Sequence, residues 1–123
     1  PVPVGPEIII IAVDSLEARK EIWELLKPIE GSLLPFNCYI DARMVGELLR
    51  ILVVNPRDTY SLEKYQKKMD STTPASSEFC TAKSIVYNTF ICGGIIASIV
   101  KKYAKREGTK LDTTFDISQL STT

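Results

Sequence analysis

Two carboxylates and one thiol are the candidates for chemistry in this sequence. Asp14 directly follows the apolar run Ile8–Val13, and Asp41 ends the alternating stretch that begins at Phe36. In open α/β sheets, ligands bind outside the carboxyl ends of the strands, so both acids stand where a site would form. Cys80 stands at the predicted start of a helix, where the positive end of the helix dipole favours a nucleophilic thiolate.

Both acids also have a structural interpretation. Asp14 with Glu17 three residues later forms a capping-box pattern, so Asp14 could simply cap the following helix. Asp41 is followed two residues later by Arg43, with which it could form an ion pair at the end of a strand. The local pattern leaves a functional and a structural role open for each acid.

The three cysteines are widely spaced, and they include no Cys-x-x-Cys pair that would indicate a zinc site or a redox motif. We expect Cys38 and Cys92, which lie inside apolar runs, to be small buried hydrophobes, and Cys80 has the same alternative. This pattern of cysteines favours a reducing, cytoplasmic compartment.

The composition argues against two classes of function. The chain has no histidine, which is the commonest general base and a common zinc ligand. Its 15 Lys and Arg residues balance 15 Asp and Glu residues, so there is no basic surface to neutralise the phosphates of a nucleic acid. We therefore expect neither a nucleic-acid partner nor chemistry that depends on an imidazole.

The elements around Asp14 form one predicted βα unit. Ile8–Val13 is rich in β-branched residues and is typical of a parallel strand covered on both faces. The capping pattern predicts a helix from Asp14 to about Lys27. Arg19 is expected mostly on the polar side of this helix. The predicted core side contains Ile22, Leu25, Leu26 and Ile29, with Trp23 adjacent.

The rest of the chain predicts more strands and two helices. A strand over Phe36–Asp41 and a strand over Leu48–Val54 are expected to pair antiparallel across the link near Gly46. Ser61–Met69 is typical of a short charged helix, and Leu111–Ile117 of a closing strand.

A long uncharged helix is predicted from about Cys80 to Glu107. Before it, residues 70–78 are rich in Ser, Thr and Pro, which favours a flexible crossover loop. The uncharged run Ser84–Val100 is interpreted as a buried core helix, with a tail anchor as the alternative. We expect no membrane association.

Several segments resemble motifs of the ThiF/HesA/MoeB family. Ile9–Ser15 followed by Arg19 resembles the family's "vi-x-x-x-D-s-x-x-x-R" stretch, and Ile40–Glu47 resembles its "iDgRmgge" strand turn. Tyr65 resembles the tyrosine after the long strand. The opening of the family's long helix, "C-x-x-x-s-i-x-y", is matched by Cys80, Ser84, Ile85 and Tyr87.

The resemblance covers roughly Glu7 to Ile117 and implies one partial domain over residues 1–123. The implied fold is the C-terminal half of a Rossmann-like ThiF/MoeB-type domain, a mixed sheet with a long buried helix. By the same resemblance, Asp14 helps to hold Mg-ATP with Arg19 in support, Asp41 and Arg43 lie near the substrate, and Cys80 matches the family's reactive cysteine. The family's zinc-binding cysteine pairs have no counterpart here.

The activity implied by the resemblance is ATP-dependent adenylation. The C-terminal carboxylate of a β-grasp ubiquitin-like or sulfur-carrier protein attacks the α-phosphorus of ATP, and the products are an acyl adenylate and pyrophosphate. A cysteine such as Cys80 could then capture the acyl group as a thioester. The family's glycine-rich phosphate turn and its ATP-binding Arg and Lys belong to the first half of the domain and have no counterpart in this sequence.

An isolated chain of this kind is expected to be an incomplete catalyst. It would be a truncation, a proteolytic fragment or a split subunit that needs an N-terminal half to complete the ATP site. The alternative is a non-catalytic scaffold subunit that pairs with an active partner. In either case half a sheet leaves the strand Ile8–Val13 with an unpaired edge, so a homo- or hetero-oligomer is expected.

Overall fold

The computed structural model describes residues 7–71 and 86–122 of the 123-residue chain. The described part forms an α/β structure around a five-stranded mixed sheet, in the order β1-β2-β3-β4-β5. The strands are β1 (Ile8–Ile11), β2 (Cys38–Val45), β3 (Leu48–Val54), β4 (Asp112–Asp116) and β5 (Ser121–Thr122). The described helices are α1 (Leu16–Leu26), α2 (Thr59–Ser71) and α4 (Val86–Ala104). The predicted α/β class with a mixed sheet is confirmed.

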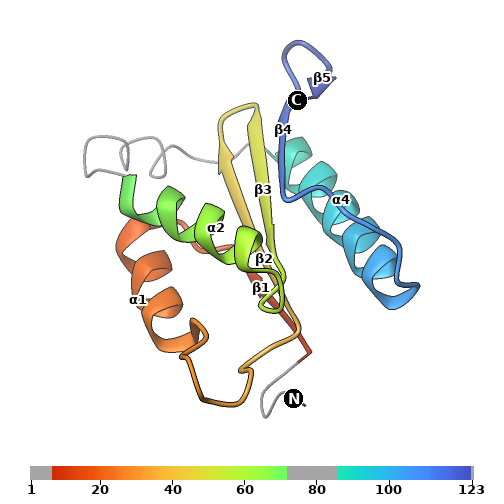
Figure 1. The fold of residues 1–123 in the computed structure, drawn as a ribbon. Helices are drawn as coiled ribbons and strands as arrows, with labels where there is room; N and C mark the ends of the chain where they lie inside the picture. The colour runs from red at the N-terminus through yellow and green to blue at the C-terminus, as the bar shows by residue number, and fades with distance from the viewer. Residues whose placement is uncertain (1–6, 72–85, 123) are drawn as a thin grey trace.

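The sheet is the middle of three layers. Helices α1 and α2 lie on one face of the sheet and α4 lies on the other (Figure 1). Strand β1 pairs parallel with β2, whereas the pairs β2–β3, β3–β4 and β4–β5 are antiparallel. The parallel pair places the carboxyl end of β1 beside Asp41, because Ile11 and Asp41 are partners in the ladder.

The predicted hairpin across Gly46 is confirmed, but β2 differs from its predicted range. Gly46 has a φ of +57°, a left-handed conformation that glycine adopts without a side-chain clash. The ladder runs from Tyr39↔Val54 to Val45↔Leu48, so β2 continues four residues beyond the predicted end at Asp41. The charged residues that suggested a strand end lie within the strand.

Strand β1 is shorter than predicted, because it ends at Ile11 and not at Val13. The carbonyl oxygen of Val13 accepts a hydrogen bond from Arg19 Nη2 at 2.8 Å, so the backbone turns toward α1 at this point. Asp14 is exposed in that turn.

The predicted capping role of Asp14 is wrong, because Ser15 is the N-cap of α1. Ser15 has extended backbone angles, and its Oγ accepts a hydrogen bond from the Ala18 N–H at 3.1 Å. That leaves the Asp14 carboxylate available for another role.

Because Ser15 and not Asp14 caps α1, substitutions of these two neighbours should differ in their effect on stability. Ser15→Ala is expected to lower the free energy of unfolding by about 1 kcal/mol, because the Ala18 N–H loses its acceptor. Asp14→Ala is the matched control and should change it by less than about 0.5 kcal/mol, since Asp14 is exposed. Urea unfolding followed by circular dichroism measures both, and equal losses would contradict the assignment of the cap.

The buried face of α1 differs from the prediction in part, since Ile22 and Leu26 pack partly buried against the core as expected. Its buried residues are Leu16, Arg19 and Trp23, whereas Leu25 is 84% exposed and Ile29 is 69% exposed. Arg19, expected on the polar side, is 1% exposed. The helix is therefore rotated so that a guanidinium lies in the core.

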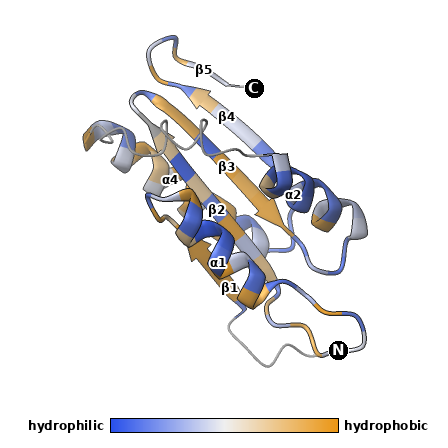
Figure 2. Cartoon of the chain, turned by 90° about the vertical axis from the view of Figure 1, so that its left-hand side faces the viewer, coloured by the Kyte–Doolittle hydropathy of each residue, from blue (hydrophilic) through white to orange (hydrophobic). Residues whose placement is uncertain are grey.

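Two apolar clusters fill the two sides of the sheet. The cluster under α1 and α2 contains four aromatic rings, those of Trp23, Phe36, Tyr39 and Tyr65. The cluster under α4 is mainly aliphatic, and its buried members are Cys38, Ile40, Ala42, Leu49, Ile51, Val53 and Cys92. Figure 2 shows the corresponding hydrophobic colour along β1 and β3 and a paler β4. The sheet is thus covered on both faces around β2 and β3.

Helix α4 is buried on one face only, which corrects the expectation of a helix buried throughout. Cys92 and Asn88 are buried, whereas Phe90 is 77% exposed. The Asn88 side chain donates to the Gly46 carbonyl oxygen at 2.8 Å and so ties the helix to the hairpin turn. No helix within the described residues is long and apolar enough to cross a membrane.

Candidate functional site

Asp41 is the centre of a buried polar cluster between the sheet and its helices. Its side chain is fully buried. Arg19 Nε donates to Oδ1 at 2.8 Å, while Arg43 Nη2 and the Tyr65 hydroxyl donate to Oδ2 at 2.9 and 2.7 Å. These donors come from α1, β2 and α2, so one carboxylate joins three elements.

The charges of the cluster are matched by hydrogen bonds. Burial disfavours the charged form of Arg43, but its hydrogen bond and attraction to Asp41 outweigh this effect and raise its pKa. Burial and the neighbouring Asp41 carboxylate raise the pKa of Tyr65 far above its ordinary value, so the hydroxyl stays protonated and donates. Charged donors on a carboxylate give stronger hydrogen bonds than neutral ones. The cluster is therefore a rigid support.

Arg19 connects this cluster to the exposed acid. Besides Asp41, its guanidinium donates from Nη2 to the carbonyl oxygens of Val13 and Ala42, at 2.8 and 3.2 Å. Val13 immediately precedes Asp14, so Arg19 fixes the backbone from which the Asp14 carboxylate projects. The structure thus places Asp14 in an exposed position beside the buried cluster.

The four predicted site residues that the structure describes differ in what they can contact. Asp14 is exposed, whereas Arg19 and Asp41 are buried and bonded to the chain itself. The Arg43 side chain is 14% exposed, so it is the member of the cluster that reaches solvent. The ion pair between Asp41 and Arg43, one of the two interpretations of the sequence, is confirmed at 2.9 Å. This geometry favours a structural role for Asp41.

Tyr65, which the sequence singled out only by its resemblance to a family tyrosine, bonds to Asp41, and Tyr39 packs beside Tyr65 with the ring centroids 5.6 Å apart. The Tyr39 side chain is fully buried, and burial followed by the Asp41 charge raises its pKa to about 12. A signal for Tyr65 exists in the sequence, since Ser61, Tyr65 and Met69 recur every four residues and form the buried side of α2. No comparable signal in the sequence links either tyrosine to Asp41.

The cysteines divide as predicted where they can be compared. Cys38 and Cys92 are buried, and burial raises the pKa of Cys38 to about 11 and that of Cys92 in the same direction. Cys80 lies outside the described residues, and so does most of the crossover loop expected over residues 70–78; Asp70 and Ser71 are not loop residues but the last two residues of α2. The nucleophile role of Cys80 therefore stays a prediction.

Brief alkylation tests that prediction. Iodoacetamide at neutral pH should modify Cys80 at least about tenfold faster than Cys38 or Cys92, because the thiolate is the reactive form and burial suppresses it in the other two. Cys38 should react appreciably only as the pH approaches its raised pKa. Peptide mapping reads all three sites, and equal labelling of the three would return Cys80 to a packing role.

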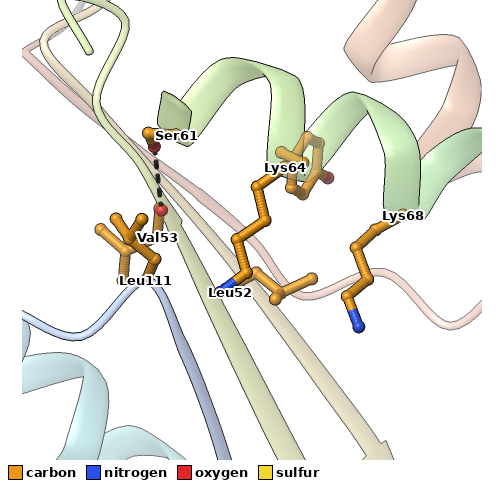
Figure 3. A pocket seen from close by; sticks show the side chains of 7 residues that line it. Leu52, Val53, Ser61, Lys64, Lys68 and Leu111 are labelled. Carbon is orange, nitrogen blue, oxygen red and sulfur yellow. Dashed lines mark hydrogen bonds between the residues drawn. The ribbon is translucent and has the colours of Figure 1, made fainter. Parts of the chain in front are cut away.

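A small pocket opens between α2 and the sheet but cannot hold a nucleotide (Figure 3). Leu52 and Leu111 form its apolar floor, and Lys64 and Lys68 extend over it from α2. The Ser61 hydroxyl on its rim donates to the Val53 carbonyl oxygen at 3.5 Å. The interior has space for about one water molecule.

Metal binding can be assessed from the donor groups of the described residues. Over residues 7–71 and 86–122, no three side chains of His, Cys, Asp or Glu lie close enough together to enclose a metal ion. A single exposed carboxylate such as Asp14 nevertheless fits magnesium, which keeps several waters and binds one or two carboxylates together with substrate phosphates. Asp14 is thus compatible with a nucleotide-borne magnesium ion.

Comparison with protein-family models finds no match for this chain, and comparison with curated proteins finds none either.

Proposed function

We propose that this chain is the C-terminal half of a Rossmann-like ThiF/HesA/MoeB-type adenylating domain. Its function would be to help activate the C-terminal carboxylate of a β-grasp ubiquitin-like or sulfur-carrier protein with ATP. The observation that carries the proposal is the meeting of separate motifs in one cluster. Arg19, the Asp41–Arg43 pair and Tyr65 come from three stretches that each resemble the family, and they bond to one another.

Asp14 is the residue proposed to face the nucleotide. It is exposed three residues after the last residue of β1, beyond the carboxyl end of the parallel pair, where ligands bind in open α/β sheets. There its carboxylate would hold the magnesium ion of Mg-ATP. A bound magnesium ion neutralises charge that develops on the phosphates during transfer.

The buried cluster is proposed to hold Asp14 in place. Arg19 fixes the Val13 carbonyl oxygen, Asp41 fixes Arg19, and Tyr65 fixes Asp41. A ligand-binding side chain works best when a second layer of hydrogen bonds restricts its backbone and rotamer. The partly exposed Arg43 is the proposed contact to the carboxyl terminus of the carrier protein, because a guanidinium pairs well with a carboxylate.

On its own, the chain holds only part of the proposed ATP site. It should bind Mg-ATP with a dissociation constant no better than about 1 mM, which corresponds to about 4 kcal/mol, since Asp14 is proposed to hold only the magnesium ion and the phosphate-binding residues belong to the other half. Isothermal titration calorimetry measures this, with a folded Asp14→Ala chain as the control. Micromolar binding by the isolated chain would contradict the assignment of the missing residues to another half.

The positive test joins the chain to an N-terminal half of the same domain type. The joined protein should exchange labelled pyrophosphate into ATP when a carrier protein with a free C-terminal carboxylate is present. The same carrier with its C-terminal carboxylate converted to an amide is the matched control and should support no exchange. Absence of exchange from a folded, joined protein would favour the alternative of a non-catalytic scaffold subunit.

A further inference from the structure

One edge of β1 has no strand beside it among the described residues. β1 is the outermost strand of the sheet and pairs only with β2. The Glu7 carbonyl oxygen accepts hydrogen bonds from the Asn37 and Cys38 N–H groups, at 3.0 and 2.9 Å. Backbone groups of successive strand residues point in opposite directions, so Ile9 also bonds toward β2. The N–H and C=O groups of Ile8 and Ile10 therefore point away from the sheet.

This edge lacks the features that usually prevent strand pairing. Natural edge strands are protected by charged residues, proline or bulges, and Ile8–Ile11 contains none of them. The Ile10 side chain is 47% exposed, because α4 packs over β2 and β3. The outermost strand at the other end, β5, is two exposed polar residues, Ser121 and Thr122. The two edges of the described sheet thus differ sharply in their capacity to pair.

We propose that β1 of a second copy of this chain covers this edge, pairing antiparallel about a two-fold axis that passes between the two Ile9 residues. The outward backbone groups require an extended strand, which excludes a helix as the occupant. The side chains on both faces require a strand that is uncharged and β-branched throughout. Among the described strands, β1 itself is the one that meets this requirement.

The register follows from the faces of the strand. Residues directly opposite each other in an antiparallel pair share one face of the sheet, which allows the register with Ile9 opposite Ile9 and Ile8 opposite Ile10 of the other copy. In this register every outward N–H and C=O group of Ile8 and Ile10 finds a partner. The two-fold axis is perpendicular to the sheet, so the α1/α2 layers of both copies lie on the same side. An N-terminal half of the proposed domain would compete for this edge, so the pairing is proposed for the chain on its own and is tested without reference to adenylation.

Proline substitution tests the backbone pairing. Because the Ile10 N–H points away from β2, Ile10→Pro removes no hydrogen bond within one chain, and proline is tolerated at such edge positions. Light scattering on the isolated chain should give the mass of a dimer at high protein concentration, and the mass of a monomer for Ile10→Pro. Ile10→Ala is the matched control: it trims the same side chain, keeps the N–H and should remain dimeric.

Cross-linking tests the register without depending on the proline variant. In a Cys80→Ser background with dissolved oxygen as the oxidant, Ile9→Cys should form an intermolecular disulfide, because residues facing each other in a non-hydrogen-bonded pair have Cα atoms about 4.5 Å apart, within the range of a disulfide. Ile10→Cys is more exposed, but it lies opposite residue 8 and should cross-link at least about tenfold more slowly.

A monomeric wild-type chain at high concentration would overturn the proposal, as would a dimer that survives Ile10→Pro. Faster cross-linking through Ile10→Cys than through Ile9→Cys would overturn it as well, because chance collisions favour the more exposed thiol. If the chain pairs only with a different protein through this edge, the wild-type chain alone is monomeric and the proposal fails.

Discussion

Asp41→Ala is expected to lower the free energy of unfolding by about 3–5 kcal/mol, a large part of the stability of a domain of this size. The substitution removes the one carboxylate that Arg19, Arg43 and Tyr65 share. Two guanidinium groups would then remain in or near the core without a counter-ion. Breaking a buried pair is more costly than the pair's net contribution, because the remaining charge cannot regain its hydration.

Urea denaturation followed by circular dichroism measures the effect. The matched control is Glu24→Gln, which breaks the exposed ion pair of Glu24 with Lys27, 2.7 Å long, and should cost less than about 1 kcal/mol. If Asp41→Ala cost no more than Glu24→Gln, the cluster would not hold α1 and α2 against the sheet. Asp41→Asn keeps the shape of the side chain but removes its negative charge, so the amide cannot neutralise the two cations. This variant shows how much of the loss comes from charge alone.

Asp14→Ala in the protein joined to its N-terminal half is expected to reduce ATP–pyrophosphate exchange at least about a hundredfold, comparable to the loss of one electrostatic stabiliser of a transition state. Asp14 is exposed, so the same change should leave the urea midpoint nearly unaltered. The combination of lost exchange and retained stability distinguishes a ligand-binding carboxylate from a structural one.

Ser15→Ala is the control for Asp14→Ala in the exchange assay. It lies next to Asp14 and weakens the cap of α1, but it removes no group proposed to face the nucleotide. It should therefore lower stability and retain most of the exchange activity. Unchanged exchange in Asp14→Ala would mean that the exposed carboxylate has no part in nucleotide binding.

The strands were predictable where the apolar pattern is continuous. Leu48–Val54 was predicted with the bounds that the structure has, because the run ends in turn residues and Gly46 opens the hairpin. The second strand was placed too early, since Asp41 and Arg43 were interpreted as strand-end residues. Local patterns cannot show that a partner strand and a buried counter-ion will stabilise charged residues inside a strand.

The buried face of α1 could not be predicted for a related reason. Arg19 is of a residue type that is usually exposed, and only the packing of α1 against the middle of β2 provides the Asp41 carboxylate that offsets the cost of burying it. Leu25 looked like a core residue by spacing, yet it is 84% exposed. Tertiary ion pairs override the hydrophobic period of a short helix. The position of Asp14 after the first strand, in contrast, was predicted from the sequence, although that strand is only partly buried and not covered on both faces as expected.

The packing of Trp23 makes it an intrinsic fluorescent probe for the position of α1. It is the one tryptophan in the chain, it is 2% exposed, and its Nε1 donates to Gln66 Oε1 at 2.7 Å. The rings of Tyr39 and Tyr65 lie 5.2 and 4.7 Å from it, centroid to centroid. At these separations light absorbed by either phenol is passed to the indole, so tyrosine excitation yields indole emission while α1 is docked. Detachment of α1 would shift that emission to the red and restore tyrosine fluorescence. These two signals therefore monitor the docking of α1 in real time without a label.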